Sequence, residues 1–175
     1  MNWYQNVFEL IDFRSFSNLW FWLALAVTWS SASHWVLGVP WDMALRAKKG
    51  KNPQSVIDFE DMVRINTNRI LFIAQESGLL LSGMVAFALT SLVLLGFVYD
   101  NEFSQAVFSL SLPLTLVGLL SVHTATRIKA EGLAGAALFK RLNRHRFIIQ
   151  VIGVVSLFFT AMWGMYQNMN AGVLG

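Results

Sequence analysis

Three ionisable side chains lie within long apolar stretches, and they are the first candidates for chemistry: His34, Glu76 and His123. Ionisable groups are costly in hydrocarbon, so each is a functional candidate by default. Two histidines on separate helices could ligate a b-type haem. A histidine–carboxylate set could instead bind a quinone headgroup or relay protons. The sequence predicts that the three side chains lie at similar depth, within roughly a turn of one another.

A purely structural role is the alternative for the same three residues, and it is the one we favour. His34 continues a line of small residues and could hydrogen-bond to a neighbouring helix. Glu76 follows Arg69 by two helical turns and could pair with a basic group near the membrane surface. His123 precedes Arg127 by one turn and could lie at the level of the lipid headgroups. On this interpretation the protein holds no cofactor.

Other catalytic chemistry finds no support in the residues. Cysteine is absent, which excludes disulfides, thiolate nucleophiles and cysteine-ligated zinc or iron–sulfur clusters. The sequence contains no phosphate-binding loop, HExxH, GxSxG or GxGxxG motif. We therefore expect no enzymatic activity, no catalytic residue and no metal site. One acidic group among several spans, without repeats, is also untypical of a self-contained transporter.

The composition indicates the elements that must position these residues. Apolar residues make up 55% of the 175 residues and charged residues only 13%, about half the share usual in a soluble domain. The apolar residues form runs that can cross a hydrocarbon core of about 30 Å. The sequence predicts an all-α, integral membrane four-helix bundle, a single membrane domain over residues 1–175, with spans at about 18–39, 70–98, 103–126 and 147–168.

The basic residues predict the orientation of the spans. Twelve of the 13 Lys and Arg residues fall in the loops 42–69 and 127–146. By the positive-inside rule, these loops are cytoplasmic, and both termini then face the outer, periplasmic side. The net charge of +3 follows from this asymmetry, and we do not take it as a sign of nucleic-acid binding.

Several segments are expected to lie at the membrane surface. Residues 2–13 have an apolar face and predict an interfacial helix, and residues 128–143 predict a second amphipathic stretch lying flat at the inner surface. His145 is expected to lie there too. Basic side chains that would attract anionic lipid, and aromatic side chains typical of the interface, are Lys140, Arg141, Arg144, Arg146, Trp20, Trp22 and Trp41.

Local patterns add detail about the helices. Ser55 and Asp58 resemble a capping box, and no proline occurs from residue 56 to 99, so the second span is expected to continue a cytoplasmic helix. Small residues spaced four apart would let helices approach closely. Such stripes are Gly78, Ser82, Ala86 and Thr90 in the second span, and Ser156, Thr160 and Gly164 in the fourth.

Two stretches carry a resemblance to a known family. The runs FELIDFRSFSNLWFW (8–22) and SHWVLGVPWDM (33–43), and less closely residues 68–70, resemble a family of small alphaproteobacterial integral membrane proteins described as "component of SufBCD complex". The resemblance covers mainly the first 45 residues. It implies location in a Gram-negative inner membrane. The family's description implies iron–sulfur assembly, but this chain has no cysteine with which to hold a cluster.

Together these observations lead to one functional expectation and one alternative. We expect a non-catalytic accessory subunit of a larger bacterial inner-membrane assembly, with respiratory or photosynthetic complexes as the most plausible hosts. Its partners would be other membrane-protein subunits, the lipid bilayer, and anionic lipid at the cytoplasmic face. The alternative is a redox or quinone- or haem-binding membrane protein that uses His34, Glu76 and His123.

Overall fold

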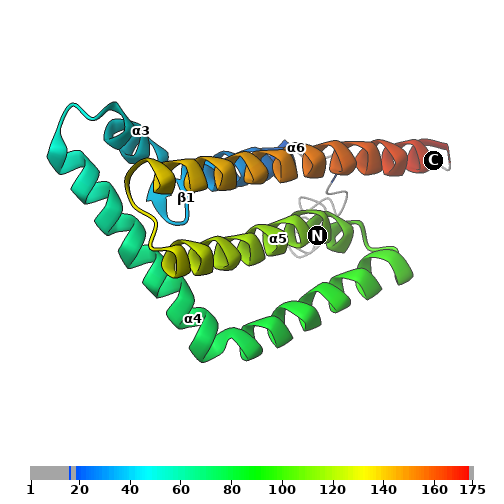
Figure 1. Cartoon of the computed structure of the whole chain (residues 1–175). Coiled ribbons are helices and arrows are strands. Elements are labelled where there is room, and N and C mark those ends of the chain that lie inside the picture. The colour runs from blue at the N-terminus through cyan, green and yellow to red at the C-terminus, as the bar shows by residue number, and fades with distance from the viewer. Residues whose placement is uncertain (1–15, 17–18, 174–175) are drawn as a thin grey trace, which may run out of the picture.

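The computed structural model describes Phe16 and residues 19–173, with side chains up to residue 169. The predicted interfacial helix at 2–13 lies outside the described residues. In chain order the elements are α2 (Leu19–His34), β1 (Trp35–Val36), β2 (Val39–Pro40), α3 (Trp41–Lys49), α4 (Pro53–Val93), the π-helical turn η2 (Leu94–Val98), α5 (Glu102–Glu131) and α6 (Gly135–Val173). The fold is thus almost entirely helical (Figure 1), as the sequence predicts.

Three helices within the described residues are long and apolar enough to cross a membrane. They are Pro53–Val98, Glu102–Glu131 and Gly135–Met169. These helices contain the predicted spans at 70–98, 103–126 and 147–168. α5 and α6 lie side by side, while α4 crosses one end of α5 and then bends about midway along its length (Figure 1). Helices long and apolar enough to cross a membrane are therefore confirmed for three of the four predicted spans.

The first predicted span differs from the structure at its C-terminal end. α2 ends at His34, and the next residues form a hairpin in which Trp35 pairs with Pro40 and Val36 pairs with Val39. Leu37 and Gly38 make the turn with φ values of 53° and 74°. Two consecutive positive φ angles suit a tight hairpin turn, and Pro40 cannot donate a helical hydrogen bond. The expected helix over 18–39 is therefore wrong beyond residue 34.

Because α2 is shorter than the predicted first span, it is not among the helices long enough to cross a membrane. A helix of 16 residues is about 24 Å long, less than the roughly 30 Å of a hydrocarbon core. A four-helix bundle with both termini on the outer side accordingly stays a prediction.

The hairpin and α3 help to build a first apolar core at one end of the molecule. α3 is amphipathic, with its apolar face buried and Arg46, Lys48 and Lys49 in its last turn. Gly50, at φ 62°, ends α3 in the left-handed conformation that glycine adopts easily. The core joins the hairpin and α3 to the start of α4, the end of α5 and the start of α6 through Val36, Leu37, Val39, Trp41, Ala44, Ala47, Phe59, Val63, Ile128, Leu138 and Leu142.

α4 begins one turn earlier than the predicted cap. Asn52 is the N-cap residue, and its side-chain oxygen accepts a hydrogen bond from the backbone N–H of Gln54 at 3.0 Å. Pro53 occupies the first helical turn, where no intrahelical donor is needed. Ser55, predicted as the cap, instead donates its hydroxyl to the carbonyl oxygen of Asn52. The predicted continuity of this helix into the second span is confirmed.

The amphipathic stretch at 128–143 does not form a helix of its own. α5 continues to Glu131, and Gly132 ends it at φ 56°, with its N–H donating to the carbonyl of Ile128. Gly135, at φ 55°, then starts α6. The predicted surface helix is wrong because Gly132 and Gly135 turn the chain. The first part of the stretch 128–143 belongs to the end of α5, and the last part belongs to the start of α6.

A second apolar core holds α2 against α6. Leu25, Trp29 and Ile149 are buried there. A Cβ atom at Gly153 would lie 2.9 Å from Cε3 of Trp29, which is closer than side chains normally approach. The absence of a side chain at Gly153 therefore lets the Trp29 ring pack directly on the α6 backbone.

Candidate functional site

The three residues predicted to carry chemistry have exposed side chains in the structure. His34 lies at the end of α2, where its ring contacts Trp35 at a centroid distance of 5.9 Å. Glu76 lies on α4 and His123 on α5. Within the described part of the chain, no hydrogen bond or ion pair joins any two of these residues, nor Glu76 to Arg69, and no group of three potential metal ligands occurs. A shared cofactor site stays a prediction.

His145, expected at the membrane surface, is instead buried between helices. Its side chain is 2% exposed. Nδ1 lies 2.9 Å from the hydroxyl oxygen of Thr124 on α5, and Nε2 has no partner among the described residues. His145 lies on the same face of α6 as the buried Leu138, Leu142 and Ile149. This spacing of three and four residues marks a core position, and it was the signal in the sequence that could have placed the histidine correctly.

Two further buried polar atoms lack a described partner. They are Nε1 of Trp29 on α2 and the hydroxyl oxygen of Thr67 on α4. A buried polar group without a hydrogen bond costs about 1–3 kcal/mol. The interior of the protein therefore contains polar groups at three helices, counting His145, and none of them was singled out as a candidate from the sequence.

Gln105, near the start of α5, connects three elements and was also missed. Its side chain is 1% exposed. Nε2 donates to the carbonyl oxygen of Gly96 in η2 at 2.8 Å and to Oδ1 of Asp100 at 3.3 Å. Oε1 accepts from Nε1 of Trp163 at 2.9 Å and from Nε2 of Gln167 at 2.6 Å. A glutamine that uses both ends of its amide in this way fixes the positions of η2, α5 and α6 together.

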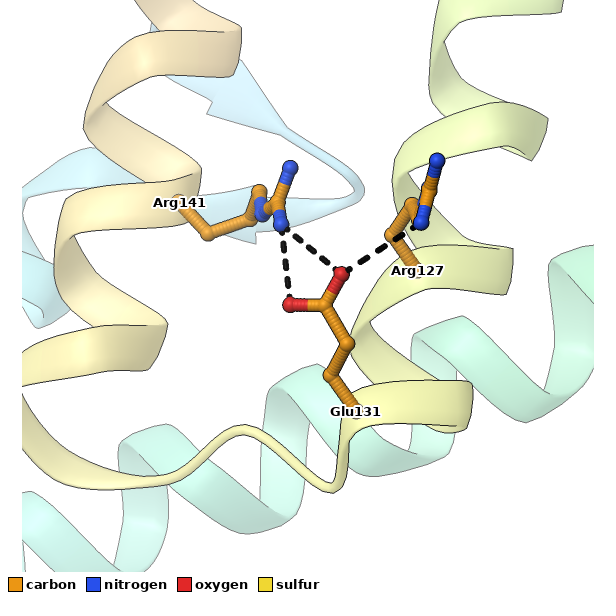
Figure 2. Close-up of polar contacts among 3 residues, drawn as sticks. All are labelled: Arg127, Glu131 and Arg141. Carbon is orange, nitrogen blue, oxygen red and sulfur yellow. Dashed lines mark hydrogen bonds and ion pairs between the residues drawn. The ribbon is translucent and has the colours of Figure 1, made fainter.

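Figure 2 shows an ion-pair cluster at the turn between α5 and α6. Glu131 accepts two hydrogen bonds from Nη2 of Arg141, at 2.9 and 3.1 Å, and Arg127 lies 3.8 Å away from the same carboxylate. Nearby, the backbone N–H of Gly135 donates to Oε1 of Glu60 on α4 at 2.7 Å. The two carboxylates thus connect the ends of α4, α5 and α6 on the basic side of the protein.

The predicted surface residues fall into two groups. Lys140, Arg144 and Trp20 are exposed, as expected for side chains that meet lipid or water. Trp41 is buried, and its ring lies 5.5 Å from the ring of Phe139, so its predicted place in an aromatic belt at the interface stays a prediction. Trp41 is the first residue of α3, and its side chain packs within the first apolar core.

Two other predicted surface side chains bind within the protein. The guanidinium of Arg146 lies 4.8 Å from the centroid of the Trp41 ring, and its Nε donates to the carbonyl oxygen of Ser33. The indole N–H of Trp22 donates to the carbonyl oxygen of Phe16.

Among the three membrane-length helices, the one that contains α4 has the least buried apolar window. None of its most apolar 18-residue window is buried. Leu79 is 92% exposed, and Leu80, Met84 and Phe87 are also exposed. No residue of the predicted packing stripe Gly78, Ser82, Ala86 and Thr90 is buried by the described chain, whereas Ser156, Thr160 and Gly164 on α6 are buried as expected.

Comparisons with protein families, curated proteins and solved structures give no match to this chain. Function must accordingly be argued from the chain itself.

Proposed function

We propose that the protein is a non-catalytic accessory subunit of a larger bacterial inner-membrane assembly, such as a respiratory or photosynthetic complex. The observation that carries the proposal is the C-terminal half of α4. Large apolar side chains cover this stretch, and none of its most apolar window is buried against the rest of the chain. Apolar side chains that its own chain leaves unburied in this way are available to pack against a neighbouring subunit.

Glu76 on the same helix supports a protein neighbour rather than lipid alone. Its carboxylate is exposed within the predicted span 70–98, and no described residue pairs with it. A charged side chain facing lipid is costly, and intramembrane carboxylates are usually paired or face the interior of a bundle. A subunit that supplies a lysine, an arginine or a hydrogen-bond donor at this position would satisfy the carboxylate.

The stripe of small residues on α4 gives a second reason. Gly78, Ser82, Ala86 and Thr90 recur every fourth residue and are not buried by the described chain. Small residues at this spacing allow the close helix–helix approach that is typical of membrane-protein interfaces. The stripe thus supports the proposal that this part of α4 packs against a helix of another subunit.

Extraction in a gentle detergent, followed by native separation and mass spectrometry, tests the proposal. We expect the chain to migrate with other membrane proteins. A photo-crosslinking residue at Leu79 should capture one of them, and the same residue at exposed Lys51 serves as the control. Migration solely as a monomer of 19.7 kDa protein mass would contradict the proposal.

Glu76→Gln separates an assembly role from a chemical one. If the carboxylate is ionised and paired with a buried cation of another subunit, the variant leaves that cation uncompensated at a cost of roughly 3–5 kcal/mol, and the assembly dissociates. Asp58→Asn, at an exposed acid in the first turns of α4, is the matched control and should leave assembly unchanged. Normal assembly of Glu76→Gln with lost turnover of the host complex would overturn the accessory role.

A further inference from the structure

A hollow lies on the surface of α6 beside the turn that joins it to α5. Its volume is about 560 Å³. It is lined by the cations Lys140, Arg141 and Arg144, by the amide of Asn143, and by the apolar side chains of Leu133 and Phe147.

The hollow carries an excess of positive charge. Lys140, Arg141 and Arg144 recur at spacings of one, three and four residues along α6, which places their side chains along one side of the helix. Glu131 binds Arg141 and so neutralises one of the three charges (Figure 2). Lys140 and Arg144 are exposed, and within the described chain neither forms an ion pair. The hollow therefore has the charge to hold an anion.

The apolar rim indicates what kind of anion would fit. Phe147 lines the same hollow, is 62% exposed, and begins the uncharged part of α6 that continues to the end of the described helix. Leu133 lines the hollow from the α5–α6 turn. The cations thus lie where an apolar membrane helix meets its charged end, which is the level of lipid phosphates. A free phosphate would bind the cations but would make no apolar contact with Phe147.

We propose that this hollow binds the headgroup of an anionic phospholipid. Lys140 and Arg144 contact the phosphate, Asn143 donates to its oxygens, and the acyl chains run from the hollow along Phe147. This site is more specific than a general attraction between the basic loops and an anionic bilayer. It also stands independently of the accessory-subunit proposal, because it needs only the spanning helix and its own side chains.

The test uses the full chain in nanodiscs of phosphatidylcholine, with phosphatidylglycerol as the probe. Bound phosphatidylglycerol is measured by native mass spectrometry and by titration. The test variant is the double substitution Lys140→Gln and Arg144→Gln. The control is the double substitution Lys49→Gln and Lys51→Gln, which removes the same charge from exposed residues outside the hollow.

We expect the dissociation constant for phosphatidylglycerol to rise about 25-fold in the test variant, since each basic side chain near an anionic surface contributes roughly fivefold. The control should change by less than about twofold, and millimolar inorganic phosphate should not displace the lipid. The charge-preserving pair Lys140→Arg and Arg144→Lys should bind nearly as well as the natural chain, which checks that the double variant fails through charge and not through misfolding.

Three results would overturn the proposal. Equal losses in the test and control variants would mean that binding reflects general surface charge. Displacement by inorganic phosphate would identify a free-anion site. Absence of stoichiometric lipid, together with an acidic protein that co-purifies with the natural chain but not with the test variant, would identify a protein partner instead.

Discussion

Replacing Gln105 by leucine should destabilise the protein more than any exposed polar substitution in the membrane helices. The side chain is buried and takes part in four hydrogen bonds, to Gly96, Asp100, Trp163 and Gln167. Hydrogen bonds between membrane helices average about 0.6 kcal/mol each, and those in soluble proteins about 1 kcal/mol. Four bonds then give about 2–4 kcal/mol. Leucine is of similar size, so most of the loss comes from the partners left without a bond.

The assay is reversible unfolding in mixed micelles, titrated with a denaturing detergent. Gln150→Leu, at an exposed position on α6, is the matched control and should change the free energy of unfolding by less than about 0.5 kcal/mol. Gln167→Leu removes one of the four bonds and should lie between the two, at about 1 kcal/mol. A Gln105→Leu variant as stable as the control would refute the inference that this amide holds η2, α5 and α6 together.

Three other predictions concern packing, charge and orientation. Gly153→Leu should cost about 1–3 kcal/mol in the same unfolding assay, because Trp29 occupies the space beside it. Gly118→Leu should not, because a Cβ atom added at Gly118 would have no side chain or other helix within 4 Å. Glu131→Gln should cost less than about 1 kcal/mol, since its ion pairs are partly exposed to solvent, and a larger loss would show that the cluster is a main support of the α5–α6 turn. A topology reporter inserted at Gly50 should be active only in the cytoplasm, and activity on the other side would reverse the predicted orientation.

The sequence predicted the membrane helices well because one simple physical quantity determines them. An uncharged run of about 20 residues has few other stable forms in lipid, so the spans at 70–98, 103–126 and 147–168 could be found without knowing what packs against them. The start of α4 was predicted less well: the cap is Asn52, followed by Pro53 in the first turn, and not Ser55. The hairpin after His34 depends on two residues with positive φ, only one of which is glycine, so the pattern was weaker there.

The candidate site was harder to predict because burial depends on partners that are distant in sequence. A stripe of small residues is present on both α4 and α6, yet only the stripe on α6 is buried by the described chain. The spacing of His145 from Leu138, Leu142 and Ile149 indicates a core position, but Gln105 is buried by side chains of another helix, and the sequence gives no sign of those contacts. Ionisable residues in apolar runs can thus be found from the sequence, but the sequence does not show which of them contact one another.

The packing of α2 against α6 also has a consequence for synthesis. α2 is made before its partners on α6, Ile149 and Gly153. The hydrogen bond from Arg146 to Ser33 spans 113 residues. At about 5–20 residues per second, a ribosome needs roughly 6–23 s to cover that distance. During this interval Trp29 faces lipid or the insertion machinery, and chains that stop before α6 leave the same surface open to membrane proteases.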